Sequence, residues 1–226
     1  MKSSKRTWMQ AMAAIGFAVL TFPALATAFV EGKDYTKLST AQPTLSKDKV
    51  EVVEFFWYGC PHCYRLQKPW EQWLAVNGKS VDYRPQPAVL GRSWEIMARA
   101  YHAMVASGGF DRDLHHKIFT SIHEKNMGLQ TLDGDEPKQL YAFIEKEKGA
   151  VYLQKFKQDY AGFSMGARIA KDREMQKIYQ LEGTPAIVVG GKYSVNPGNA
   201  GGEAAMVPVV DFLVKKVSEE LKAVKK

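Results

Sequence analysis

The amino-acid sequence predicts an α/β protein: a small sheet domain with a helical block inserted into its middle. Strand patterns lie near both ends of the chain, at 50–58 and 184–195, and the roughly 80 residues before the second pattern carry only helical patterns. The only two cysteines, Cys60 and Cys63, lie three positions apart directly after the first strand pattern. That spacing calls for a chemical reason.

Residues 1–28 are predicted to be a cleaved signal peptide. A basic start precedes an apolar run over 8–25, and Ala26 and Ala28 supply the small residues of a cleavage site. The alternative is a retained membrane anchor, which fits less well because Pro23 interrupts the run. The protein is therefore expected to be exported.

The charge of the chain excludes a nucleic-acid partner. The formal net charge is +7, and three basic residues of the predicted signal peptide supply +3 of it, which leaves +4 for the rest. Acidic residues are dispersed throughout, and no block rich in Lys and Arg is interleaved with aromatic residues.

The cysteine pair lies at a predicted junction between a strand and a helix. The run over 50–58 is apolar and rich in β-formers, Gly59 breaks it, and 61–76 reads as a helix. Pro61 suits the first helical turn, where a missing N–H has no consequence. The N-terminus of a helix favours negative charge, so a thiolate is well placed there.

The remaining elements complete a strand–helix–strand unit and a later strand–strand–helix unit. After an extended lead-in over 29–48 and the first strand and helix, a short strand is expected over 81–84, ended by Pro85 and Pro87. Five helices are then expected, over 94–105 and near 111–124, 136–148, 150–160 and 164–178.

The end of the chain returns to strands. A hairpin is expected from 184–189 and 193–195, with Gly190 and Gly191 in its turn, followed by a closing helix over 207–222. This hairpin and the first strand would belong to the same sheet.

The cysteine motif predicts a redox-active disulfide. We expect Cys60 to be the nucleophile, because the N–H groups of His62 and Cys63 can point at its sulfur, and Cys63 to be the resolving thiol one turn deeper. A protonated His62 imidazole would add positive charge. A disulfide across four residues closes a loop too short to restrict the unfolded chain much, so a purely stabilising role is not expected.

A metal site is the rival interpretation of a different class. Cys60, His62 and Cys63 are all possible ligands of zinc or copper, but a closed zinc site needs a fourth donor, and no second cysteine pair exists. The other histidines have no metal-ligand spacing. We therefore expect no metal and no cofactor besides the Cys60–Cys63 disulfide.

The chain resembles the DsbA-type thiol:disulfide interchange proteins, periplasmic dithiol oxidases with a thioredoxin fold that carries an inserted helical domain. The resemblance implies a thioredoxin-like domain over 29–90 and 180–226 and an inserted all-helical domain over 91–179. It rests on Glu54-Phe55-Phe56, Cys60-Pro61-His62-Cys63-Tyr64, Gly183-Thr184-Pro185-Ala186, Gly191-Lys192-Tyr193 and Asn196-Pro197.

Several site residues are implied by this resemblance. Glu54 would be a buried proton acceptor for Cys63, with a pKa raised by burial; the alternative is an acid at the strand edge that faces water. Pro185 would be cis and face the disulfide, which leaves the backbone of Thr184 free to pair with an extended substrate. The alternative is a proline that merely begins a strand. Pro197, beside a mobile glycine-rich loop over 198–202, would border a substrate groove.

The resemblance also implies substrates and a partner. The protein would oxidise newly exported, cysteine-containing proteins and be reoxidised by a DsbB-like, quinone-linked membrane protein. Thr184 stands where several relatives have Val, and Thr is common there in isomerases and reductases, so an isomerase or reductase remains the alternative. Isomerases of the DsbC type carry an N-terminal dimerisation domain, whereas only about 30 mature residues precede Cys60 here. We therefore expect a monomeric oxidase.

Overall fold

The computed structural model describes residues 29–224. The predicted signal peptide lies outside the described residues. Within them, no helix combines the length and the apolar character that crossing a membrane requires.

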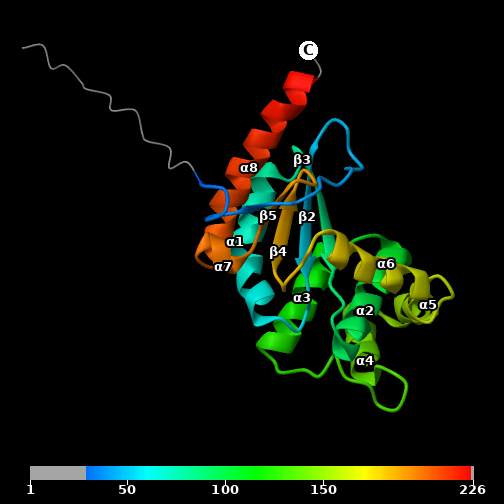
Figure 1. Cartoon of the computed structure of the whole chain (residues 1–226). Coiled ribbons are helices and arrows are strands. Elements are labelled where there is room, and N and C mark those ends of the chain that lie inside the picture. The colour runs from blue at the N-terminus through cyan, green and yellow to red at the C-terminus, as the bar shows by residue number, and fades with distance from the viewer. Residues whose placement is uncertain (1–28, 225–226) are drawn as a thin grey trace, which may run out of the picture.

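A five-stranded sheet lies at the centre, in the order β1-β5-β4-β2-β3 (Figure 1). The central strand β2 runs parallel to β3 and antiparallel to β4, and the β4–β5 hairpin continues the sheet to a two-residue edge strand. The strands are β1 (Thr36–Lys37), β2 (Val50–Phe56), β3 (Val81–Pro87), β4 (Ala186–Val189) and β5 (Tyr193–Val195).

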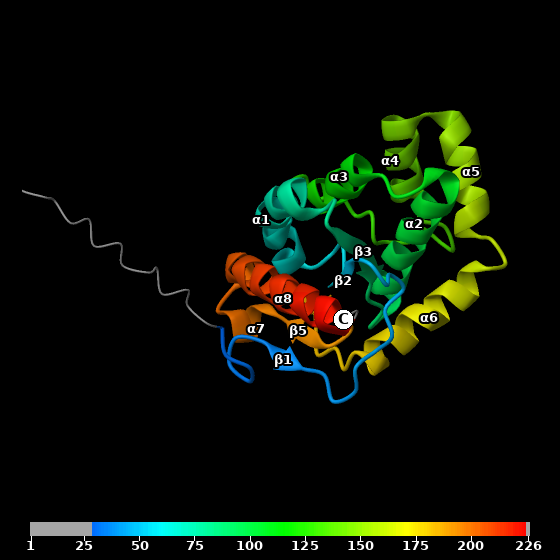
Figure 2. The same cartoon turned by 90° about the horizontal axis from the view of Figure 1, so that it is seen from above.

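Two long helices cover one face of this sheet. α1 (Pro61–Asn77) and α8 (Glu203–Val224) lie side by side there (Figure 2). Trp70 of α1 and Val210 of α8 are fully buried in the core that they share with the strands. On the opposite face, Phe55 of β2 packs against Tyr179, just after the last inserted helix.

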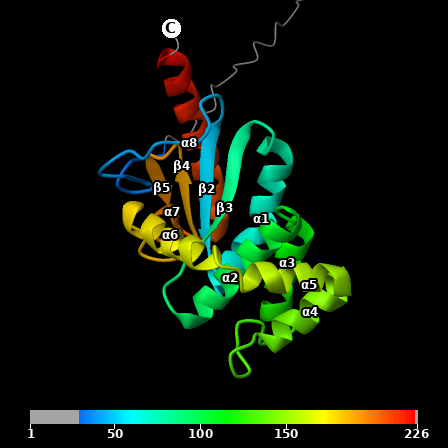
Figure 3. The ribbon, with the colours of Figure 1, turned by 90° about the vertical axis from the view of Figure 1, so that its right-hand side faces the viewer.

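The helical block lies between β3 and β4 in sequence and to one end of the sheet in space (Figure 3). Its largely apolar core also contains Phe56 and Tyr58, together with Cys60 and Cys63. The cysteine motif therefore lies where the two parts of the molecule meet. The helices are α2 (Arg92–Gly108), α3 (Arg112–His123), α4 (Lys138–Lys148), α5 (Ala150–Tyr160) and α6 (Met165–Ile178).

This architecture confirms the predicted fold class, an α/β sheet domain with inserted helices. The prediction for the third strand was wrong at its end: Pro85 and Pro87 belong to β3, which continues to Pro87 instead of stopping at residue 84. Because β3 is an edge strand and pairs only with β2, its prolines need not donate to a neighbour on the other side.

The segment after β5 also differs from the prediction. The expected glycine-rich loop begins with the short helix α7 (Pro197–Ala200), closed by a capping box in which Asn196 and Asn199 each accept from the other's backbone N–H, at 3.0 and 2.9 Å. Gly201, with a φ of 87°, ends it. The closing helix then begins at Glu203, four residues before the predicted start.

Candidate active site

The active-site helix begins at the cysteine motif. Cys60 is the N-cap of α1, with an extended backbone (φ −85°, ψ 117°), and Pro61 occupies the first turn. The carbonyl of Cys60 accepts from the Tyr64 N–H at 3.0 Å. Both cysteines are free thiols in this structure. Cys60 is 7% exposed and Cys63 is fully buried, so the first sulfur is the one that a substrate can reach.

The pKa of the Cys60 thiol is lowered from its ordinary value of 9.0 to about 5. The largest cause is a hydrogen bond from the side chain of Cys63, and burial opposes it. The side chain of Thr184 and the backbone N–H groups of Cys63 and His62 lower the pKa further. Cys60 is therefore largely a thiolate at neutral pH.

The pKa of Cys63 moves in the opposite direction, well above the ordinary value of 9.0. Burial is the largest cause, followed by the hydrogen bond to Cys60 and the repulsion between the two sulfurs as anions. Cys63 is therefore held as a neutral thiol that donates to its neighbour.

The loop before β4 faces the first cysteine. The Thr184–Pro185 peptide bond is cis, as the resemblance implied. In the thiol form, the Sγ of Cys60 donates to the carbonyl of Thr184 at 3.3 Å, across 124 positions of sequence. The buried Oγ1 of Thr184 has no partner in hydrogen-bond geometry, and the same side chain lowers the pKa of both cysteines. It is a donor available to a sulfur anion.

Glu54 is fully buried in β2, so the alternative of an acid that faces water was wrong. The Tyr83 hydroxyl donates to its Oε2, while its Oε1 has no partner. Burial is the main reason that the pKa of Glu54 rises from 4.5 to about 7, and the Tyr83 hydroxyl opposes the rise. This carboxyl can gain or lose a proton near neutral pH.

The imidazole of His62 has partners that sequence reasoning missed. Its Nδ1 lies 2.6 Å from the Oε1 of Glu203, at the start of α8, and 2.7 Å from the Nη2 of Arg65. The largest effects on the pKa of Cys60 include the backbone N–H of His62, and the expected contribution of a protonated imidazole stays a prediction. Glu203 lies 141 positions from His62 in the sequence. The only feature of the sequence that could have singled it out is that it follows two glycines shortly before the predicted closing helix.

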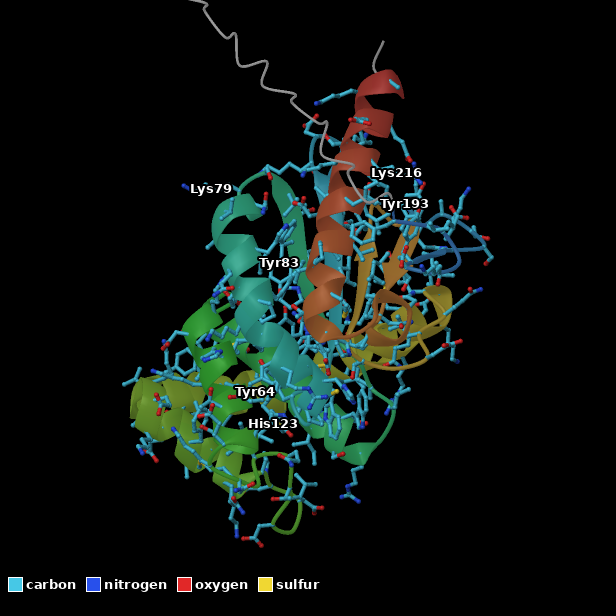
Figure 4. The ribbon with its side chains drawn as sticks, turned by 90° about the vertical axis from the view of Figure 1, so that its left-hand side faces the viewer. Tyr64, Lys79, Tyr83, His123, Tyr193 and Lys216 are labelled. Carbon is cyan, nitrogen blue, oxygen red and sulfur yellow. The ribbon has the colours of Figure 1, made fainter. Side chains whose placement is uncertain are left out.

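Helix α3 supports the motif from the other side. His115 is buried, and its Nδ1 pairs with the Tyr58 hydroxyl at 2.7 Å. Burial also lowers the pKa of His115 to about 3, so the ring is neutral. The Nε2 of His123 donates to the Tyr58 carbonyl at 2.8 Å, and its ring stacks on Tyr64, with centroids 4.9 Å apart (Figure 4). These histidines pack and orient the motif.

A groove of about 370 Å³ runs beside the site. Its lining brings together Thr184, Pro185 and Pro197, the three residues predicted for substrate binding. Residues 179–183 and the edge strand β1 also line it. Within 29–224, no group of three or more His, Cys, Asp or Glu side chains is arranged to hold a metal ion.

A reactive thiolate at a helix N-terminus, a deeper thiol and a facing cis-proline loop are the parts of a thiol:disulfide oxidoreductase. The comparisons agree. The thiol:disulfide interchange protein DsbA of Pseudomonas aeruginosa is 33% identical over 191 residues, which are 83% of this chain and 85% of the relative. That of Burkholderia cepacia is 30% identical over 207 residues, 91% of this chain and 94% of the relative. No protein-family model matches the chain.

Solved structures give the same result. The crystal structure of P. aeruginosa DsbA matches with a TM-score of 0.76 and 31% identity, covering 88% of this chain and 97% of that one. The oxidoreductase DsbA from Xylella fastidiosa matches with a TM-score of 0.72 and 31% identity, covering 83% and 96%. The chain belongs to the DsbA family of thiol:disulfide interchange proteins, and its fold is a thioredoxin fold with an inserted helical domain.

Proposed function

We propose that this dithiol oxidase introduces disulfides into newly exported, cysteine-containing proteins in the periplasm, with the Cys60–Cys63 disulfide as its redox group. A substrate thiolate attacks the Sγ of Cys60, and the bond to Cys63 breaks. A second substrate thiolate then attacks the substrate sulfur of this mixed disulfide and expels the Cys60 thiolate. The substrate loses two electrons and two protons, and the enzyme becomes the dithiol.

The observation that carries this proposal is the divergence of the two thiol pKa values. An ordinary thiol is protonated at pH 7, whereas the pKa of Cys60, about 5, lies about two units below this pH. Ionisation of Cys60 therefore stabilises the reduced protein at pH 7 in proportion to these two units. That corresponds to about 2.7 kcal/mol in favour of the reduced protein, or about 60 mV toward an oxidising potential. The stable thiolate makes Cys60 a good leaving group, so the disulfide is readily given away.

The proton that Cys63 needs can come from Glu54. When the disulfide opens, Cys63 leaves as a thiolate, which its buried position disfavours, and it must take a proton. A carboxyl with a pKa of about 7 can supply that proton and recover it later. Glu54, in β2, and Cys63, in α1, are both fully buried.

Substrate binding is assigned to the groove beside the cis proline. An extended substrate segment would pair with the backbone of Thr184 by strand addition, with Pro185 and Pro197 bordering it. Because the Thr184 carbonyl already lies 3.3 Å from the Cys60 sulfur, a segment held there would present its cysteine to Cys60.

Reoxidation is assigned to a DsbB-like, quinone-linked membrane protein that docks on the same face, and the enzyme is proposed to act as a monomer. The alternative is an isomerase or reductase of the same fold, which a measurement of the redox potential distinguishes from an oxidase.

The decisive experiment is to equilibrate the purified protein with glutathione buffers and measure the fraction reduced. We expect a potential more oxidising than that of glutathione, together with catalysed oxidation of a reduced, unfolded protein. A strongly reducing potential would identify a reductase instead. Retention of one equivalent of zinc or copper after dialysis would favour the metal-binding alternative.

A further inference from the structure

Two charged side chains and an imidazole meet beside the active-site motif. We call His62, Arg65 and Glu203 the Glu203 cluster. Glu203 is the first residue of α8, and its Oε1 lies 2.6 Å from the Nδ1 of His62, 3.0 Å from the Nε of Arg65 and 2.7 Å from the Nη2 of Arg65. One carboxylate oxygen thus joins two residues of the active-site helix to the helix beside it.

These distances assign the proton on the imidazole. The Nδ1 of His62 cannot donate to Glu203 and accept from Arg65 at the same time. If Nδ1 carries the proton, it donates to Glu203, and both nitrogens of Arg65 donate to the same oxygen, so all three contacts of that oxygen are satisfied, while the 2.7 Å contact between Nδ1 and the Nη2 of Arg65 then joins two donors. If Nδ1 were the acceptor, its lone pair would face the carboxylate at 2.6 Å. Glu203 therefore selects the Nδ1–H form and fixes the orientation of the ring.

The cluster has little to contribute to folding stability. The side chain of Glu203 is 19% exposed, but those of His62 and Arg65 are 54% and 52% exposed, and ion pairs with such exposed partners contribute little to the free energy of unfolding. Its position beside the nucleophile gives it a route to reactivity instead, because His62 is two residues from Cys60 and supplies a backbone N–H to that sulfur.

We propose that Glu203 is a positioning residue that restrains the oxidising power of the enzyme: it holds the His62 imidazole against the start of α8 and away from the Cys60 thiolate. The thiolate then depends on backbone N–H groups, on Cys63 and on Thr184. Replacing Glu203 would let the N–H of the released ring approach the thiolate and would also remove a nearby negative charge. Both changes favour the anion. This inference rests on the proposed redox function of Cys60.

The test is Glu203→Gln, with the pKa of Cys60 measured from thiolate absorbance and the equilibrium constant measured against glutathione. We expect the pKa to fall by about half a unit or more and the equilibrium to shift about threefold toward the dithiol form. The matched control is Glu219→Gln, which removes an exposed carboxylate from the same helix about 24 Å away and should change neither quantity.

A second pair of variants separates positioning from simple loss of charge. In a His62→Leu background, Glu203→Gln should shift the Cys60 pKa by clearly less than it does in the wild type, because no ring remains to be released. An equal shift in both backgrounds, or no shift in the wild type, would overturn the inference. If the wild-type protein itself were reducing, the proposed function would fail first, and the two failures would be distinguishable.

Discussion

Strand β2 buries one glutamate toward each of its ends, and the two carboxyl groups have different partners. At the far end, Glu51 accepts from the Nη2 of Arg84 at 2.6 Å and from the Leu45 N–H at 3.0 Å. At the active-site end, Glu54 accepts from the neutral Tyr83 hydroxyl, and burial raises its pKa to about 7.

The difference shows how one strand can serve both stability and chemistry. A buried carboxylate that contacts a guanidinium and a backbone N–H joins neighbouring segments of the chain. A buried carboxyl without a cation partner lies near its protonation midpoint at neutral pH and can exchange a proton. We therefore expect changes at the active-site end to alter reactivity and changes at the far end to alter stability.

The largest effect is expected from Cys60→Ser. A hydroxyl in place of the thiol cannot form the mixed disulfide, so oxidation of a reduced, unfolded protein should stop completely while the protein stays folded. The measurement is the appearance of disulfides in the substrate over time, with circular dichroism as the check on folding. Residual activity at the wild-type rate would show that Cys60 is not the nucleophile.

Glu54→Gln is expected to stabilise the fold at alkaline pH. In the wild type, the folded-state pKa of about 7 exceeds the ordinary 4.5, so the folded protein binds more protons between these values and loses stability as pH rises through this window. The cost above pH 7 is about 3 kcal/mol, and glutamine should remove it. Urea unfolding at pH 4.5, 6 and 8 tests this.

The same variant should turn over substrate more slowly, because Cys63 loses its proton partner. Equal unfolding free energies for wild type and Glu54→Gln at pH 8 would contradict the assignment of the raised pKa to burial.

Glu51→Gln changes the glutamate at the other end of β2. It should destabilise the fold, whereas Glu54→Gln should stabilise it. It leaves the guanidinium of Arg84, which is 34% exposed, without its anion, and should lower the unfolding free energy by about 2 kcal/mol. The Cys60 pKa and the potential of the folded protein should be unchanged. A shifted potential with unchanged stability would show that the two ends of β2 are not separable in this way.

The smallest effect is expected from Thr184→Val, which removes the hydroxyl at nearly constant shape. The Cys60 pKa should rise by up to about one unit, since one donor to the sulfur anion is lost. Thiolate absorbance as a function of pH measures it, and Thr184→Ser, which keeps the hydroxyl, is the control. An unchanged pKa in the valine variant would show that the hydroxyl does not serve the sulfur.

Much of the fold could be predicted because it depends on local patterns. The apolar run before Cys60, the proline in the first turn of α1 and the double-glycine turn of the last hairpin each express a preference of a few neighbouring residues. The predictions of the end of β3 and of the segment after β5 were wrong, because these features depend on more than a local sequence pattern. Pro85 and Pro87 are tolerated in β3 only because that strand lies at the edge of the sheet. The short helix α7 depends on two asparagines that cap each other.

The sequence by itself determined the redox motif, its place at the start of a helix and the interruption of the sheet domain by helices, because spacing and periodicity record these directly. Only the tertiary structure decided what surrounds the sulfurs. It brings Thr184 to Cys60 and Glu203 to His62 across 124 and 141 positions, and it buries Glu54 beside the Tyr83 hydroxyl. The pKa values of these groups depend on burial and on neighbours in space, which arise only when distant segments pack together.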